Sequence, residues 1–166
     1  EAMTMAERIA IMHLGCIEQI GSPVDIYETP ISRQVCEFIG SVNLFDGEVV
    51  DDAEDHAVIA CPQLERNIYV GHGVSTSVED KRITYALRPE KLIVTTEQPT
   101  TDHNWSVGKV HDIAYLGGHS VFYVELPSGM VVQSFVANAE RRGARPTWGD
   151  NVFVCWEDDS GVVLRS

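Results

Sequence analysis

The sequence predicts a mainly β protein with a short helical region at its front. From Asn43 onward, apolar and polar residues alternate in short runs, which is the period of a strand with one buried face. Gly, Asp and Pro separate these runs and favour turns between them. Helical spacing of apolar residues is confined to the first forty residues. Many short strands at this spacing are typical of a β-sandwich or a small barrel.

The first forty residues predict a helix, a hairpin and a second helix. Apolar residues recur at helical spacing up to Ile9, and the runs 9–13 and 16–20 then flank a turn at Leu14-Gly15. Ser22 is placed to cap a helix that has Pro23 in its first turn.

A third helix is predicted directly afterwards. Thr29-Pro30 repeats the combination of a capping residue and a proline, and Gly40 provides the C-terminal stop. The helix has one apolar stripe, formed by Ile31, Val35, Phe38 and Ile39. Such a stripe is buried against other elements in a stable protein, and we expect it to pack on the rest of this chain or on a second copy, or to stay poorly ordered.

Ten strands are predicted in the remainder of the chain. They cover residues 44–49, 57–61, 67–70, 82–86, 92–95, 107–115, 121–126, 130–136, 152–156 and 162–164. Among the turns between them are the segments 116–119, 127–129 and 158–161.

Composition and charge exclude several classes of function. The 166 residues are 44% hydrophobic and 22% charged, which is typical of a globular domain. No apolar run approaches the length of about 18 residues that a membrane span needs. The formal net charge of -13 would repel a phosphate backbone, so we expect no nucleic-acid partner. The negative charge could also suit a cationic partner, although its simpler interpretation is high solubility.

The cysteines indicate a reducing compartment. The four residues at 16, 36, 61 and 155 form no C-x-x-C pair and have no histidine at the spacing of a structural zinc site. We expect reduced core thiols, because Cys16, Cys36 and Cys155 have apolar neighbours. This pattern favours a cytoplasmic location.

The opening run resembles a known family. Residues 1–23, from Glu-Ala-Met-Thr-Met-Ala-Glu-Arg-Ile to Gln-Ile-Gly-Ser-Pro, are similar to the stretch that follows the switch histidine in ATP-binding subunits of ABC importers. In the family that histidine precedes the position of Glu1. The resemblance implies that residues 1–40 are the C-terminal tail of an ABC nucleotide-binding domain, a short α/β remnant made of a helix, a β-hairpin and two short helices.

A second resemblance covers residues 41–166. Three motifs occur in the order found in the TOBE domain of importer ATPases, and they are Leu87-Arg88-Pro89-Glu90-Lys91-Leu92, Gly108-x-Val110-x-x-Ile113-x-Tyr115-Leu116-Gly117 and Gly149-Asp150-x-Val152-x-Val154-x-Trp156. The resemblance implies an OB-like small β-barrel. The runs 43–45, 113–124 and 146–150 are most similar to polyamine importers, the putrescine branch in particular. Iron, sulfate and sugar importers share the architecture and remain alternatives.

The family implies a function for the parent subunit that this chain does not perform alone. The parent would bind ATP and Mg²⁺, contact membrane-embedded permease subunits and lie on the cytoplasmic face of the bacterial inner membrane. For this chain we expect no catalytic, cofactor or metal residue, because no nucleophile with an adjacent base stands out. We expect a regulatory module that forms a homodimer. A small-ligand sensor is the alternative, and an OB-type nucleic-acid binder is a weaker one because of the negative charge.

Several short patterns have simpler interpretations than their most specific ones. Residues 116–120 superficially resemble the signature that grips a nucleotide, but β-branched and aromatic residues follow, so a hairpin turn is favoured. Gly71-His72-Gly73 is too short for a phosphate loop. His111 and His119 would approach each other if their strands paired, with His103 as a third ligand, but scattered surface histidines are the commoner case.

Six residues are candidates for interdomain or regulatory contacts. They are Arg88, Glu90, Arg141, Arg142, Arg145 and Trp148. The first two flank Pro89 at a predicted strand end, which favours a structural ion pair or an interdomain contact over catalysis. The three later arginines form the one local basic cluster, either a solvated loop or an anion or partner site. Trp148 and Trp156 are interpreted as core or interface anchors.

Overall fold

The computed structural model describes residues 2–74, 80–138 and 145–165. Its N-terminal segment, residues 2–40, contains three short helices and one hairpin. These elements are α1 (Ala2–Met5), β1 (Ile9–His13), β2 (Cys16–Gly21), α2 (Pro23–Glu28) and α3 (Arg33–Ile39). The predicted hairpin and the predicted helix after Ser22 are confirmed. Ser22 caps α2 and forms a reciprocal capping box with Asp25.

The described residues from 43 onward, which we call the β domain, form ten strands and one turn of 3-10 helix. The strands are β3 (Asn43–Asp52), β4 (Ala57–Ala60), β5 (Ile68–Val70), β6 (Arg82–Leu87), β7 (Ile93–Thr95), β8 (Trp105–Tyr115), β9 (His119–Glu125), β10 (Val131–Ala137), β11 (Asn151–Cys155) and β12 (Val162–Arg165), and the 3-10 helix is η1 (Pro89–Lys91). Each predicted strand has a counterpart, displaced by at most a few residues at its ends. Residues 116–118 form the β8–β9 hairpin turn, as predicted.

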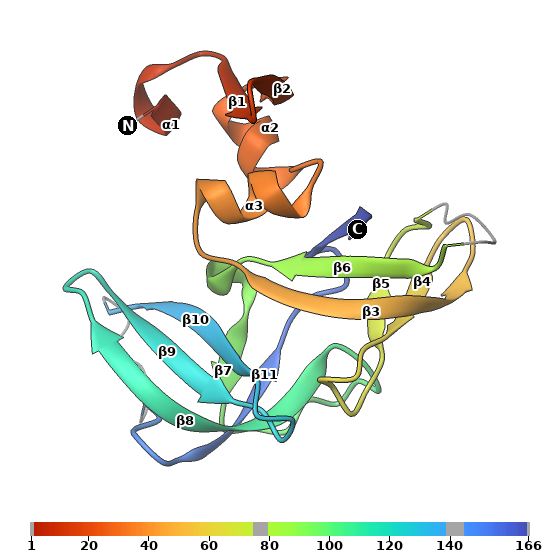
Figure 1. The fold of residues 1–166 in the computed structure, drawn as a ribbon. Helices are drawn as coiled ribbons and strands as arrows, with labels where there is room; N and C mark the ends of the chain where they lie inside the picture. Colours follow the sequence, from red (N-terminus) through yellow and green to blue (C-terminus); the bar gives the residue numbers. More distant parts are fainter. Residues whose placement is uncertain (1, 75–79, 139–144, 166) are drawn as a thin grey trace.

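Two antiparallel five-stranded sheets curl around a common core as two halves of a small barrel. The strand orders are β10-β9-β8-β11-β7 and β12-β6-β3-β4-β5. Figure 1 shows the two sheets facing each other below the N-terminal segment. The mainly β, OB-like class expected from the sequence is therefore confirmed.

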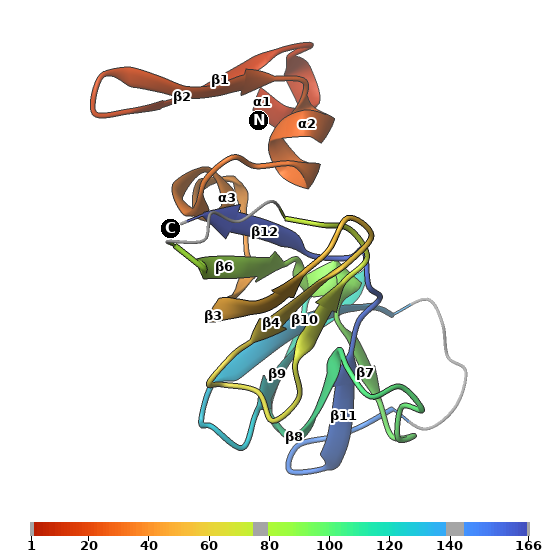
Figure 2. The same cartoon turned by 90° about the vertical axis from the view of Figure 1, so that its right-hand side faces the viewer.

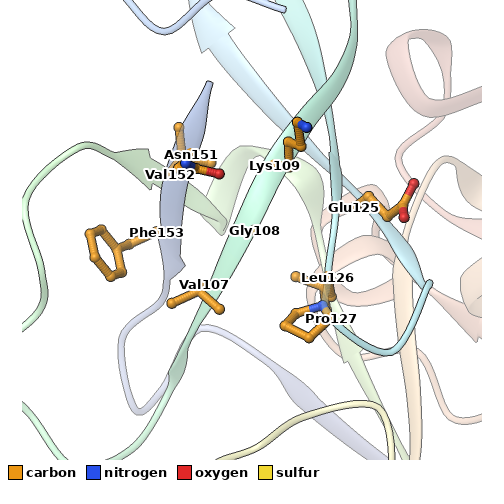
Figure 3. Close-up of a pocket in the computed structure, with 9 residues that line it drawn as sticks. All are labelled: Val107, Gly108, Lys109, Glu125, Leu126, Pro127, Asn151, Val152 and Phe153. Carbon is orange, nitrogen blue, oxygen red and sulfur yellow. The ribbon is translucent and has the colours of Figure 1, made fainter. Parts of the chain in front are cut away.

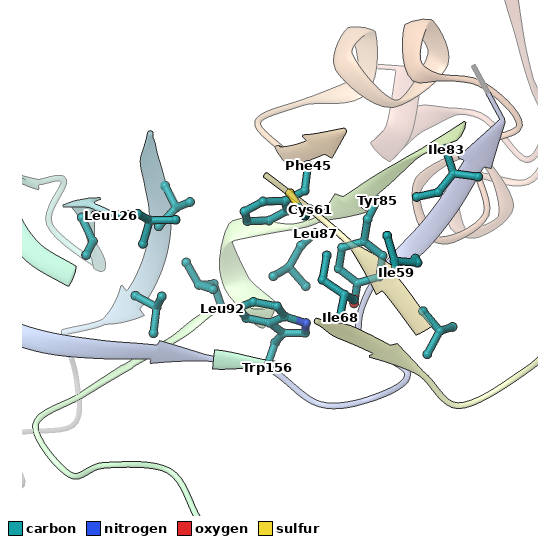
Figure 4. Packing of buried hydrophobic residues seen from close by; sticks show 14 of the residues in the cluster. Phe45, Ile59, Cys61, Ile68, Ile83, Tyr85, Leu87, Leu92, Leu126 and Trp156 are labelled. Atoms are coloured by element: carbon teal, nitrogen blue, oxygen red, sulfur yellow. The ribbon is translucent and has the colours of Figure 1, made fainter. Parts of the chain in front are cut away.

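The core lies between the sheets and is made by inward-facing residues of both (Figure 4). Phe45 of β3 stacks on Trp156, which follows β11, with ring centroids 6.0 Å apart. Tyr85, Ile59, Leu87 and Val124 are fully buried around this pair. The alternation that predicted the strands therefore has its cause in this shared core.

Two buried asparagines close the seams between the sheets. Asn43 Nδ2 donates to the Gln133 carbonyl at 2.9 Å, and its Oδ1 accepts from the Gln133 amide at 2.8 Å. Asn104 makes the same pair of bonds to Tyr69, at 2.9 and 2.8 Å. Gln133 and Tyr69 lie on β10 and β5, which are edge strands of their sheets. Each carboxamide thus satisfies backbone groups that an edge would otherwise leave unpaired.

Helix α3 differs from its prediction. Its N-cap is Ser32, whose side chain accepts a hydrogen bond from the Val35 amide, so the predicted Thr29-Pro30 cap is wrong. The predicted apolar stripe is only partly buried, because Val35 is inaccessible while Ile31 and Phe38 are 59% and 74% exposed. Thr29 does not cap α3 because it is the C-cap of α2, where its hydroxyl donates to the Asp25 carbonyl.

Two small clusters hold the N-terminal segment. Val35 packs with Ile9, Ile11 and Ile26 inside the segment. Cys36, on another side of α3, packs against Ala86 of β6 and Leu164 of β12, which belong to the β domain. The hairpin β1–β2 lies beyond the helices and stands away from the barrel (Figure 2).

One expectation about core residues is wrong, because Cys16 is exposed in the hairpin, whereas Cys36 and Cys61 are buried and Cys155 is intermediate. Trp156 is a core residue, which is one of its two interpretations. Trp148 is 60% exposed, so it is not a core residue, and its interpretation as an interface anchor stays a prediction. No helix among the described residues is long and apolar enough to cross a membrane.

Candidate functional site

Arg88 stands at the centre of the contact between the N-terminal segment and the β domain. It follows β6 directly and is only 6% exposed. Its Nη1 donates to the carbonyl oxygens of Cys36, Gly40 and Ser41 at 3.1, 3.2 and 3.1 Å. A buried guanidinium needs such acceptors because its desolvation is costly and its charge is permanent.

The position of Arg88 also suits the electrostatics of α3. Cys36 lies in the last turn of the helix, and Gly40 is its C-cap, where carbonyl groups have no partner inside the helix. A cation at this end is favoured by the helix dipole. The Arg88 guanidinium carbon also lies 4.4 Å from the centre of the Tyr27 ring of α2, which is a cation–π contact. One side chain therefore holds two helices.

The next residues of the same motif add polar contacts to α2. The Tyr27 hydroxyl donates to Glu90 Oε1, and Lys91 Nζ lies 2.6 Å from Glu28 Oε2. Burial first, and then the bond to Glu90, raise the pKa of Tyr27 far above its ordinary value, so the phenol is the donor in this pair. We call these contacts of Arg88, Glu90 and Lys91 with residues 27–41 the Arg88 joint.

A further ion pair joins the first residue of α3 to the β domain. Arg33 Nη1 of α3 lies 3.1 Å from Asp46 Oδ1 of β3, and the Thr84 hydroxyl of β6 donates to the same oxygen at 2.8 Å. Both side chains of the ion pair are about half exposed, so its contribution to stability is small. Arg33, Asp46 and Thr84 bind one another and position α3 on the β domain. Their arrangement includes no nucleophile paired with a base.

The other predicted contact residues have their partners elsewhere. Arg145 donates from Nη1 to Asn138 Oδ1 at 2.7 Å and from Nη2 to the Ala137 carbonyl at 2.6 Å. Trp148 Nε1 donates to Asp112 Oδ1 at 3.0 Å, and this bond is the main cause that lowers the pKa of Asp112. Arg141 and Arg142 lie outside the described residues.

The histidines do not assemble into a metal site within the described residues. Strands β8 and β9 do pair, but His111 sits in a bulge near Val124, and His119 pairs at the other end with Ala137. His111 Nδ1 lies 3.6 Å from Glu125 Oε2, while the ring of His119 packs on Phe135. The two histidines therefore lie apart although their strands pair.

A surface pocket of about 450 Å³ lies across β8, β9 and β11. Figure 3 shows Val107, Leu126 and Pro127 at one end and Lys109 and Asn151 at the other. It has the size and the mixture of apolar and polar lining that small-molecule sites have.

Sequence reasoning missed the partners of Arg88. No sequence motif links Arg88 to Tyr27, Gly40 or Ser41, which lie about fifty to sixty positions earlier. A usable signal did exist in the sequence, because Arg88, Glu90 and Lys91 are three charged groups packed around a proline at a strand end.

The later strands match a known domain family. Residues 85–164 match the model of the TOBE domain, so the expected family is confirmed for this part of the chain. Nearly the whole chain is similar to ATP-binding subunits of polyamine importers. It is 48% identical to the putrescine transport ATP-binding protein PotG of Escherichia coli (strain K12), over 99% of this chain and 44% of that protein.

Two further relatives are spermidine/putrescine import ATP-binding proteins named PotA. The protein of Treponema pallidum (strain Nichols) is 33% identical over 99% of this chain and 46% of its own length. That of Nostoc sp. (strain PCC 7120 / SAG 25.82 / UTEX 2576) is 36% identical over 99% of this chain and 43% of its own length. The chain thus spans less than half the length of the curated relatives it matches.

Among solved structures, the cytoplasmic molybdate-binding protein ModG with molybdate bound has a similar fold. The TM-score is 0.59 at 14% identity, over 73% of this chain and 94% of that chain. At this identity the similarity supports the fold alone.

Proposed function

We propose that this chain is part of the ATP-binding subunit of an ABC importer that takes up polyamines, with putrescine as the main substrate. The similarity to PotG and PotA over 99% of the chain carries this proposal. In the whole subunit, ATP and Mg²⁺ would bind in the ATPase domain, which would contact the permease at the cytoplasmic face of the membrane. The chain itself contributes regulation and dimerisation.

We propose a division at residue 40, with the ATPase tail before it and the TOBE domain from residue 41 onward. The distribution of exposed apolar side chains supports this division. Eight of the fifteen large ones among the described residues lie in the first forty, namely Met5, Met12, Leu14, Ile17, Ile20, Val24, Ile31 and Phe38. A surface so rich in apolar groups is typical of an interaction site, and here the ATPase domain is the partner that would cover it.

The hairpin β1–β2 illustrates this open face. Ile9 and Ile11 are buried against the helices, whereas Met12 and its cross-strand neighbour Ile17 are 62% and 57% exposed. Both faces of the ribbon are therefore apolar, and only one is covered within the described residues. The coding sequence upstream of Glu1 tests the parentage. A Walker A lysine, a signature motif and a switch histidine are expected there, and their absence would overturn the proposal.

Sedimentation of the 166-residue chain at micromolar concentration tests the proposed dimer. We expect a dimer whose dissociation follows mass action. In the whole subunit, such a dimer would hold two ATPase domains at high effective concentration. A strictly monomeric chain up to about 100 times that concentration would contradict the dimerisation role.

The pocket of Figure 3 supports a second candidate function, that of a small-ligand sensor. Lys109 and Glu125, which are cross-strand neighbours, would supply one charge of each sign. Calorimetry with putrescine, spermidine, molybdate and sulfate distinguishes the candidates. Saturable heat that is lost in Lys109→Ala or in Glu125→Ala would favour the sensor, and no heat with any of the four would favour the dimer module.

A further inference from the structure

The edge strand β10 is tied to the Arg88 joint by two buried contacts. The Ser134 hydroxyl of β10 donates to the Leu92 carbonyl at 2.6 Å. Leu92 is the C-cap of η1, the turn that begins directly after Arg88. Ser134 is inaccessible to solvent. This bond connects β10 to Arg88 across only three intervening residues.

A second connection runs through Asn43. Its carboxamide bonds to both backbone groups of Gln133, the residue next to Ser134. Asn43 is only 4% exposed, and it lies two residues after Ser41, whose carbonyl accepts from Arg88. The linker 40–43 is therefore held by Arg88 at one end and by β10 at the other.

Together these contacts close a ring of buried polar bonds. It passes from the end of α3 to Arg88, through η1 to Ser134, and from Gln133 through Asn43 back to the linker. Each of these bonds resists breaking, because its loss would leave a polar group in the interior without a partner.

We propose that β10 and α3 form one coupled unit, so that a displacement of β10 is transmitted to the N-terminal segment. The far end of β10 reaches the surface, where the Ala137 carbonyl accepts from Arg145. A displacement that starts at this end is expected to reach α3 through Ser134 and Asn43. The coupling is a property of this chain, and it rests on the proposed function only for what α3 is attached to in the parent.

The seam at β5 offers a matched control. Asn104 is as buried as Asn43 and makes the same pair of bonds to an edge strand. Its other partner is Asp158 in the β11–β12 loop, at 3.0 Å. Asn104 belongs to the other seam and has no place in the ring around Arg88, so its loss costs stability without releasing α3.

Native-state hydrogen exchange of the 166-residue chain tests the coupling. Asn43→Ala is expected to raise exchange in α3 by about tenfold beyond the increase that its loss of global stability explains, as measured by urea unfolding. Asn104→Ala is expected to raise α3 exchange only in proportion to global stability. An equal excess in both variants, or none in Asn43→Ala, would overturn the proposal.

A milder variant keeps the test decisive if Asn43→Ala does not fold. Ser134→Ala removes the bond to Leu92 while leaving the β10 backbone intact, and it is expected to produce the same selective increase in α3. Exchange in α3 that follows global stability alone in Ser134→Ala would contradict the coupling. None of these outcomes depends on transport, so failure here leaves the proposed function standing.

Discussion

At the scale of single residues, Gly161 has the least room for a side chain among the described glycines. A Cβ built there would lie 2.0 Å from Cζ of the buried Tyr85 ring. We expect Gly161→Ala to destabilise the protein by at least about 1–3 kcal/mol, because the aromatic ring has no free space to move into. Urea unfolding measures this loss. Gly118→Ala is the control, since no atom lies within 4 Å of its added Cβ, and equal losses in both variants would refute the packing explanation.

Arg88 tests whether the joint needs a guanidinium or only a positive charge. Arg88→Lys keeps the charge, but its side chain is shorter and lacks the planar group that lies over the Tyr27 ring, and we expect a loss of about 2–3 kcal/mol in the free energy of unfolding. Arg82→Lys is the matched control, because the Arg82 side chain is 83% exposed. An Arg88→Lys protein as stable as the Arg82→Lys protein would show that the carbonyl contacts contribute little.

His56 predicts a pH dependence of stability. Its side-chain bonds to Asp55 and then to Asp51 raise the pKa of His56 above its ordinary value. Stability from this group is therefore fully present below the unfolded pKa, about 6.5, and is lost as pH rises through the higher folded value. We expect the urea midpoint to fall between about pH 6 and 8 by less in His56→Gln than in the wild-type chain. Identical pH profiles would contradict this.

At the scale of elements, the caps decide where the helices begin. Ser32→Ala is expected to cost about 1 kcal/mol, because it leaves the Val35 amide without its acceptor. Ser32→Asp retains an acceptor and is expected to stay near the wild-type stability. Thermal unfolding compares the stability of the two variants. A Ser32→Ala protein as stable as the wild type would contradict the role of Ser32 as the N-cap.

Most strands were predictable from the sequence because each buries one face in a common core. The alternation around Phe45 and Val49 in β3 follows directly from that burial. The start of α3 was not predictable in the same way. Ser32 and Thr29 are both good capping residues, and the choice depended on where α2 ends, because Thr29 is its C-cap and the Thr29 hydroxyl donates to the Asp25 carbonyl.

At the scale of the whole molecule, the family was predictable from the sequence and most of the joint was not. The motif around Arg88 indicated an interdomain contact, but its acceptors are main-chain carbonyl groups, which any residue carries. The sequence also gave no signal for the bonds of Asn43 and Asn104 across the seams, since nothing distinguishes these asparagines from any other asparagine in a sequence. Long-range polar pairing becomes visible only in three dimensions.

If this chain is part of a polyamine importer subunit, it can replace the matching segment of PotG. Putrescine uptake is measured in cells whose own PotG carries this chain in place of that segment, with equal expression checked by immunoblot. We expect the chimera to restore uptake and Arg88→Leu in the chimera to reduce uptake severalfold. A well-expressed, folded chimera without uptake, or one unaffected by Arg88→Leu, would refute the proposed function.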